Sequence, residues 1–208
     1  LWGFTLPHEL CYTNVLEMLD LAGVPLRAVE RAGEDPVVLG GGPAVANPWP
    51  LAPFFDAFFV GEAEEHLDAV VDALGRDGRV ARLRALAAVP GVWVPGRSDR
   101  PAVRQVFTGF STSDPVLQPI VPVLEAVHDR AVVEVMRGCT AGCRFCQAGM
   151  WYRPVRERPV ERVVAAAGRL LHETGCDEVS LLSLSSCDYG GVAEAVARIR
   201  ELRPGLRV

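Results

Sequence analysis

Three cysteines lie close together in the second half of the chain, within the string RGCTAGCRFC at residues 137–146. Cys139, Cys143 and Cys146 form the spacing C-x3-C-x2-C, which we call the cysteine motif. Thiolate sulfurs are soft ligands that suit iron–sulfur clusters and zinc. Glycines beside them let the backbone fold closely around a bulky inorganic core. The motif therefore predicts a metal centre.

The number of ligands near the motif distinguishes the possible metal centres. A structural zinc site needs four ligands, and Cys176, Cys187 and His172 lie well downstream. A ferredoxin-type cluster also needs a fourth cysteine, at a different spacing. Three cysteines leave one iron of a cubane cluster open, and the amino and carboxylate groups of S-adenosylmethionine (SAM) suit that iron. A zinc site with a distant ligand, an electron-transfer cluster and disulfides stay as alternatives.

The overall composition is that of a globular protein. Of the 208 residues, 50% are hydrophobic and 23% are charged, enough apolar surface for a core. The formal charge of −5 argues against a broad nucleic-acid-binding surface, and no apolar run predicts a membrane span. Six cysteines without a secretion signal favour metal or redox chemistry. We expect a cytoplasmic protein with no membrane partner and no indicated nucleic-acid partner.

The elements that position the motif alternate between strand-like and helix-like segments, which predicts a parallel sheet flanked by helices. Asn14 and Glu17 resemble a capping box at the start of the first helix. The first half contains expected strands at 2–6, 36–42 and 56–62, and expected helices at 14–22, 64–74 and 80–87. The second half contains expected strands at 131–136 and 178–185, and expected helices at 160–171 and 192–199.

Three regions follow from this alternation. We expect an α/β domain at residues 1–92, a proline-rich linker at 93–130, and a β/α repeat at 131–208. The periodicity of that repeat does not separate a doubly wound sheet from a barrel. Leu1 and strand-like sequence at both ends predict that the chain is part of a longer protein.

The cysteine motif, with Phe145 before its last cysteine, resembles the signature of the radical SAM superfamily. The strings EVMRGCTAGCRFCQAGMWYRPVRERP, GFTLPHELCYTNVLEMLDLAG, VVLGGGPAVANPWPLAPFFDAFFVGEAEEHL and LLSLSSCDYGG resemble a bacterial subgroup in which a cobalamin-binding-like domain precedes the radical SAM domain. The resemblance covers nearly the whole chain. It implies a partial cobalamin-binding-like, Rossmann-type parallel sheet, followed by the first β/α units of a partial TIM barrel.

The resemblance also implies an activity. The three motif cysteines would hold a 4Fe–4S cluster, and SAM would chelate the fourth iron. An electron donor such as a flavodoxin or ferredoxin would then allow reductive cleavage of SAM to a 5′-deoxyadenosyl radical, which acts on an unidentified substrate. The alternative is a non-catalytic cobalamin- or partner-binding module with a structural iron–sulfur cluster.

Several cofactor-binding residues follow from the same resemblance. Phe145 would lie against the adenine of SAM, and the serines at the end of the second barrel strand would serve its methionine amino group; their alternative role is strand-end capping. A diglycine turn would lie beside a cobalamin tail, or be no more than a tight turn. The serines are Ser183, Ser185 and Ser186, and the diglycine turn is Gly40 and Gly41. Because the motif Asp-x-His-x-x-Gly is absent, cobalamin is possible but unsupported, and His8 is expected at the surface.

The arginines after the motif and the three remaining cysteines are expected to have structural roles. We expect the arginines that follow the motif to form a solvated helix start, with anion binding as the alternative. They are Arg153, Arg156, Arg158 and Arg162. Cys187 is expected to be a packed thiol, and Cys11 and Cys176 are expected to be inert.

Overall fold

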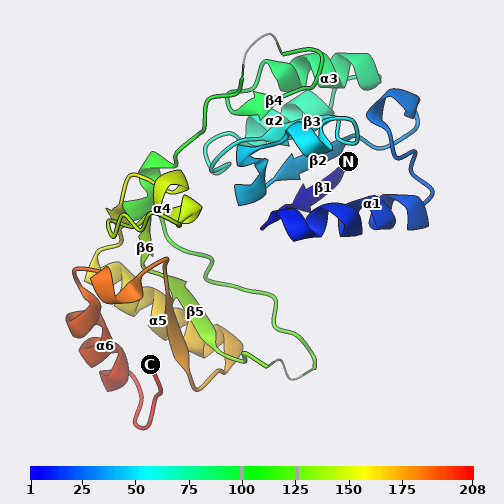
Figure 1. Cartoon of the computed structure of the whole chain (residues 1–208). Coiled ribbons are helices and arrows are strands. Elements are labelled where there is room, and N and C mark those ends of the chain that lie inside the picture. The colour runs from blue at the N-terminus through cyan, green and yellow to red at the C-terminus, as the bar shows by residue number, and fades with distance from the viewer. Residues whose placement is uncertain (99–100, 125–126) are drawn as a thin grey trace. The chain divides into compact units, whose positions relative to one another are not determined.

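The chain folds into two compact units (Figure 1). The computed structural model describes residues 1–98, 101–124 and 127–208. Unit 1 is Leu1–Phe107 and unit 2 is Thr108–Val208. Their boundary falls inside the expected linker at 93–130, of which residues 99–100 and 125–126 lie outside the described residues. The expected domain limits themselves stay predictions.

Unit 1 contains a four-stranded sheet in the order β1-β2-β3-β4. The strands are β1 (Trp2–Thr5), β2 (Val38–Gly41), β3 (Ala57–Phe59) and β4 (Val92–Trp93). The first three run parallel, as expected, but β4 runs antiparallel to β3. Residues 60–91 lie between these two strands, and the chain enters β4 from a tight turn at Gly91, where φ is +81° and a Cβ would meet Phe59 and the Val60 carbonyl.

Three α-helices and four short 3₁₀ turns complete unit 1. The helices are α1 (Tyr12–Leu21), α2 (Leu67–Leu74) and α3 (Arg79–Ala87), and the turns are η1 (Glu9–Cys11), η2 (Ala28–Glu30), η3 (Pro43–Ala46) and η4 (Trp49–Leu51). The expected capping box is wrong, because η1 runs directly into α1 and Asn14 lies inside the helix. Successive side chains of β3 point to opposite faces of the sheet. Ala57 and Phe59 pack with α2 and α3, whereas Phe58 stacks on Phe55.

A buried charged group lies under the amino ends of β2 and β3. Asp56, whose side chain is 2% exposed, pairs with Arg31 at 3.0 Å and also with Arg79. The same carboxylate accepts a hydrogen bond from the Val38 N–H at 2.7 Å. Burial lowers the pKa of Arg31 while the nearby Asp56 charge opposes that shift. The group connects three segments that are distant in sequence, and no sequence pattern indicated it.

Unit 2 is built on two parallel strands with a helix between them. Its strands are β5 (Ala131–Glu134), β6 (Met136–Arg137), β7 (Arg156–Glu157) and β8 (Val179–Leu182). Its helices are α4 (Gln147–Trp151), α5 (Val160–Thr174) and α6 (Val192–Glu201), with 3₁₀ turns η5 (Thr108–Ser111) and η6 (Ser186–Asp188). β5 pairs with β8 in parallel. A parallel bridge from Glu178 to Arg207 marks the expected third strand.

The core of unit 2 lies between this sheet and α5 and α6. Val133 and Val179 face the helices, and one face of α5 buries Val163, Ala167 and Leu170. Segments that follow the carboxyl ends of adjacent parallel strands meet at one edge of a sheet. The cysteine motif follows β5 and β6, and the serines follow β8, so both lie at that edge. Within the described ranges, no helix is long and apolar enough to cross a membrane.

We expect Asp56→Ala to lower the free energy of unfolding of unit 1 by about 3–5 kcal/mol, because it leaves two guanidinium groups without their buried counter-charge. Urea unfolding monitored by circular dichroism measures the change. Asp72→Ala, at an exposed position on α2, is the matched control and should shift stability by no more than about 0.5 kcal/mol. Equal losses in both variants would contradict a structural role for Asp56.

Candidate metal centre

The segment between β6 and β7, residues 138–155, forms a loop whose two ends are joined. We call it the cysteine loop, because it contains all three motif cysteines. β6 and β7 pair antiparallel, with Met136 opposite Glu157 and Arg137 opposite Arg156. This short ladder closes the base of the loop directly after β5. The motif is therefore held at the carboxyl edge of the parallel strands.

Gly138 is the residue that lets the cysteine loop leave β6. Its φ is +87°, and a Cβ at this position would lie 2.8 Å from the Pro154 carbonyl oxygen and 2.9 Å from that of Tyr152. Only glycine accommodates both the positive φ and this close approach of the returning chain. Gly142 also has a positive φ of +65°, but its surroundings are open. The first glycine thus serves loop closure, and the second serves the turn between Cys139 and Cys143.

The three motif cysteines are free thiols, as are the other three in the chain. The Ala141 N–H donates to the sulfur of Cys139 at 3.4 Å, and the Gly149 N–H donates to that of Cys146 at 3.4 Å. Cys143 is exposed. Hydrogen bonds to the sulfurs are among the features that tune iron–sulfur clusters. Three free thiols on one loop, two of them with a backbone N–H donor, are a donor set that fits an iron–sulfur cluster.

The sulfur ligands are not gathered into a compact metal-binding group. Across residues 1–98, 101–124 and 127–208, no three His, Cys, Asp or Glu side chains are arranged to hold a metal ion. The assignment of Cys139, Cys143 and Cys146 as ligands therefore stays a prediction. Cys176, a distant candidate for a fourth ligand, instead has its sulfur 3.8 Å from an oxygen of Asp129.

Arg158, immediately after β7, anchors the base of the cysteine loop. The residue is 4% exposed, so its expected place in a solvated helix start is wrong. Its guanidinium donates to the carbonyls of Phe110 at 2.9 Å and Glu134 at 3.0 Å, and also to that of Ser113. Burial lowers the pKa of Arg158, and the nearby Glu134 charge opposes that shift.

An aromatic ring supports the same anchor. The Phe110 ring is fully buried and lies 4.3 Å from the guanidinium carbon of Arg158 and 4.9 Å from that of Arg137. Arg137 also pairs with Glu134 at 2.9 Å. The hydroxyl of buried Tyr189 donates to the Arg158 carbonyl at 2.7 Å, and burial raises its pKa. Sequence reasoning missed Phe110, because it placed that residue in a linker.

The other arginines that follow the cysteine motif lie nearer the surface than Arg158. Arg162 pairs with exposed Asp114 at 2.7 Å, and Arg156 donates to the Pro154 carbonyl at 3.2 Å. Arg153 lines a shallow hollow beside Cys139. Cys139 itself contributes to the lining of this hollow.

The serines after β8 bond to one another and to the backbone. The hydroxyl oxygens of Ser183 and Ser186 are 3.0 Å apart, and that of Ser186 donates to the Leu181 carbonyl at 3.0 Å. The Ser185 hydroxyl donates to Asp188 at 2.7 Å. This is the pattern of strand-end capping, the expected alternative role. Contact between these serines and SAM stays a prediction.

Two other residues near the motif are accessible. The Phe145 side chain is 91% exposed and therefore available to a ligand, although its contact with adenine stays a prediction. Cys187, in η6, is exposed, so its expected packing is wrong. In unit 1, His8 is at the surface as expected, with a ring nitrogen 3.6 Å from the sulfur of Cys11.

The glycines after β2 serve backbone packing. A Cβ at Gly40 would lie 2.9 Å from the Phe58 ring, and one at Gly42, where φ is +94°, would lie 2.8 Å from the Leu6 carbonyl oxygen. Gly41 has open space on its Cβ side. The arrangement is that of a tight turn, and a role for Gly40 and Gly41 beside a cofactor stays a prediction.

Comparison with known proteins adds two family matches. Residues 1–95 match a family described as "Radical SAM proteins, N-terminal", and residues 133–208 match the "Radical SAM superfamily". An uncharacterized protein of Methanocaldococcus jannaschii is 27% identical over 194 residues, covering 91% of this chain. The chain spans 39% of the length of that relative.

We expect Arg158→Met to destabilise unit 2 by about 3 kcal/mol, because it leaves three carbonyls without their shared donor at the base of the cysteine loop. Thermal and urea unfolding of the purified protein measure the loss. Arg169→Met, at an exposed position on α5, is the control and should change stability by less than about 0.5 kcal/mol. If Arg158→Met were as stable as this control, Arg158 would not be the anchor.

Proposed function

Because this chain belongs to the radical SAM superfamily, we propose that its cysteine loop holds a 4Fe–4S cluster and that the protein is an enzyme that cleaves SAM reductively. Cys139, Cys143 and Cys146 are the proposed ligands. The observation that carries the proposal is a set of three unpaired thiols on one loop, closed at its base by β6 and β7.

The chain's own residues would hold and orient this centre. The motif thiolates would bind three irons, and the N–H groups of Ala141 and Gly149 already point at two of the sulfurs. Such bonds help to set the reduction potential of a cluster. When bound, a cluster with one open iron supplies the electron that converts SAM to a 5′-deoxyadenosyl radical.

Binding of SAM would draw on two further parts of unit 2. The exposed ring of Phe145 can pack on the adenine, as ring faces do through stacking. The hydroxyls of Ser183, Ser185 and Ser186 lie at the carboxyl edge of β8, and would exchange their present hydrogen bonds for bonds to the methionine part of SAM. The parallel pairing of β5 with β8 supports this, because it puts both segments at one edge.

The remaining components of the reaction come from outside the chain. We propose that a flavodoxin or ferredoxin supplies the electron in a cytoplasmic setting. The substrate is a molecule from which the radical abstracts a hydrogen atom. For unit 1 we propose a cobalamin-binding-like fold, supported by the parallel strands β1–β3 and the tight turn after β2. Cobalamin itself is a possible ligand of that unit.

We expect Cys139→Ala, Cys143→Ala and Cys146→Ala each to abolish cluster binding, because two thiolates hold a cubane poorly. Anaerobically reconstituted wild-type protein should contain about four irons and four sulfides per chain, measured by metal and sulfide analysis. Cys11→Ala and Cys176→Ala are the controls and should retain the full iron content. Loss of iron from Cys176→Ala would instead indicate four protein ligands, and stoichiometric zinc in protein purified anaerobically would contradict an iron centre.

We expect the full-length protein, reduced with dithionite in the presence of SAM, to form 5′-deoxyadenosine slowly even without substrate. Liquid chromatography detects this product, and electron paramagnetic resonance should show a SAM-dependent change in the reduced cluster. The Cys143→Ala variant is the matched control and should do neither. An intact, reducible cluster that neither binds SAM nor yields the product would replace this proposal with the structural-cluster alternative.

A further inference from the structure

Tyr189 joins the segment after β8 to the base of the cysteine loop. The residue is 2% exposed and its ring belongs to the core of unit 2. Its hydroxyl donates to the Arg158 carbonyl at 2.7 Å, directly after β7, the strand that closes the loop. Residues 183–188, which we call the serine turn, immediately precede Tyr189 in the chain. One buried side chain therefore connects the two segments proposed to hold SAM.

A second hydrogen bond makes the same connection. The Gly190 N–H donates to a carboxylate oxygen of Glu157, on β7, at 3.2 Å. A Cβ at Gly190 would lie 3.1 Å from the other oxygen of that carboxylate. A Cβ at Gly191 would overlap Val160 and lie 2.9 Å from the Tyr189 hydroxyl oxygen. The two glycines thus let the chain pass close to β7 and to the start of α5.

The serine turn is itself closely hydrogen-bonded. The Ser186 hydroxyl donates to the Leu181 carbonyl at 3.0 Å, at the β8 end of the turn. The Ser185 hydroxyl donates to the Asp188 carboxylate at 2.7 Å, and the Asp188 N–H donates to the Ser185 carbonyl at 3.0 Å. The Tyr189 N–H donates to the Ser186 carbonyl at 3.3 Å. A turn bonded in this way follows its two ends, which are β8 and Tyr189.

We infer that Tyr189 and Glu157 are positioning residues that hold the serine turn in register with the cysteine loop, so that one SAM molecule can contact both. The inference rests on the proposed function, in which the cluster and the serine hydroxyls bind the same SAM molecule. Tyr189 and Glu157 act through the turn and do not touch SAM themselves. Register matters because a displacement of about 1 Å in a binding group can lower a rate on the order of 100-fold.

The first test is Tyr189→Phe, which keeps the buried ring and removes its hydroxyl. Full-length protein, reconstituted anaerobically and reduced with dithionite, is titrated with SAM while the electron paramagnetic resonance spectrum of the cluster is followed. We expect the dissociation constant of SAM to rise about fivefold, the effect that loss of one hydrogen bond can have. The iron content should stay at the wild-type value. Glu201→Ala, at an exposed position on α6, is the control and should bind SAM like the wild type.

A pair of Glu157 variants separates the hydrogen bond from the charge. Glu157→Ala removes the acceptor of the Gly190 N–H and should weaken SAM binding about fivefold. Glu157→Gln keeps a side-chain oxygen that accepts this N–H, so it should restore the affinity to within about twofold of the wild type. This pair decides the question if Tyr189→Phe does not fold by circular dichroism.

A third measurement needs no cluster. Hydrogen–deuterium exchange of the metal-free protein, followed by mass spectrometry, should be about fivefold faster in the serine turn of Tyr189→Phe and Glu157→Ala. Exchange in α5 and α6 should stay unchanged, whereas a loss of general stability would accelerate it throughout unit 2.

The inference alone is overturned if the wild type binds SAM and folded, iron-loaded Tyr189→Phe and Glu157→Ala bind it equally well. It is also overturned if Glu157→Gln is as weak as Glu157→Ala, if either variant loses its iron, or if exchange accelerates equally throughout unit 2. A wild-type cluster that does not respond to SAM would overturn the proposed function as well.

Discussion

The buried guanidinium of Arg158 is the interaction on which the candidate metal centre depends. It donates hydrogen bonds to the carbonyls of Phe110 in η5, Ser113 shortly after η5, and Glu134 in β5. It also lies over the Phe110 ring. A buried cation is tolerated only while such acceptors surround it. Because Arg158 directly follows β7, holding it in place also holds β7 against β6. The base of the cysteine loop is closed for that reason.

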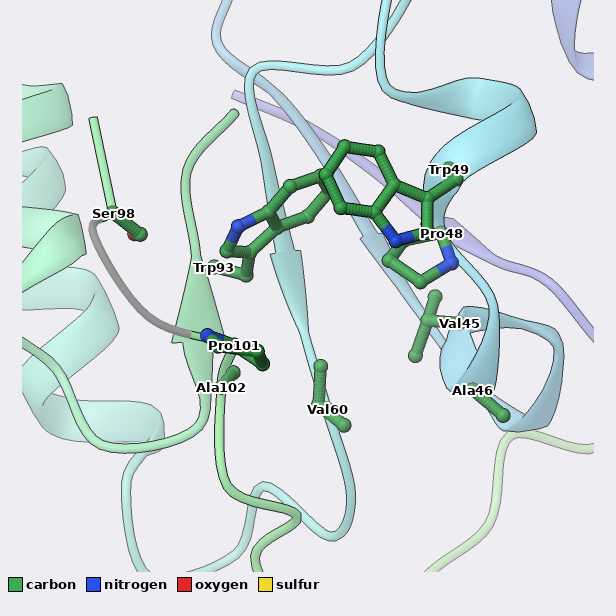
Figure 2. A pocket seen from close by; sticks show the side chains of 9 residues that line it. All are labelled: Val45, Ala46, Pro48, Trp49, Val60, Trp93, Ser98, Pro101 and Ala102. Atoms are coloured by element: carbon green, nitrogen blue, oxygen red, sulfur yellow. The ribbon is translucent and has the colours of Figure 1, made fainter. Parts of the chain in front are cut away.

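Both units place their candidate sites by the same rule. In unit 2, the segments after β5 and β8 meet at one edge because these strands are parallel neighbours. In unit 1, the segments after β2 and β3 line a pocket beside Trp49 and Trp93 for the same reason (Figure 2). The strands build the rigid part of each unit, and the loops at their carboxyl ends carry the reactive or ligand-facing side chains.

The failed predictions have two kinds of physical cause, which are contact between residues distant in sequence and a neighbouring turn that shifts the start of a helix. The charge of Arg158 predicted solvent exposure, but acceptors from another segment make its burial possible. Asn14 and Glu17 had the spacing of a capping box, but the preceding turn η1 starts the helix earlier. The parallel sheet was correct for β1–β3, whereas β4, which follows two helices rather than one, runs antiparallel to β3.

The alternation of strands and helices, the resemblance to the radical SAM superfamily and the three thiols of the cysteine loop could be predicted from the sequence alone. These properties depend on residue types and local spacing, which a single sequence displays directly. The pairing of β6 with β7, the burial of Asp56 and Arg158, and the edge-to-face contact of Trp49 with Trp93 became apparent only in the folded structure. Each of these features depends on which distant segments fold against one another. The energies of burial and of strand pairing are set by those contacts, which local sequence patterns do not reveal.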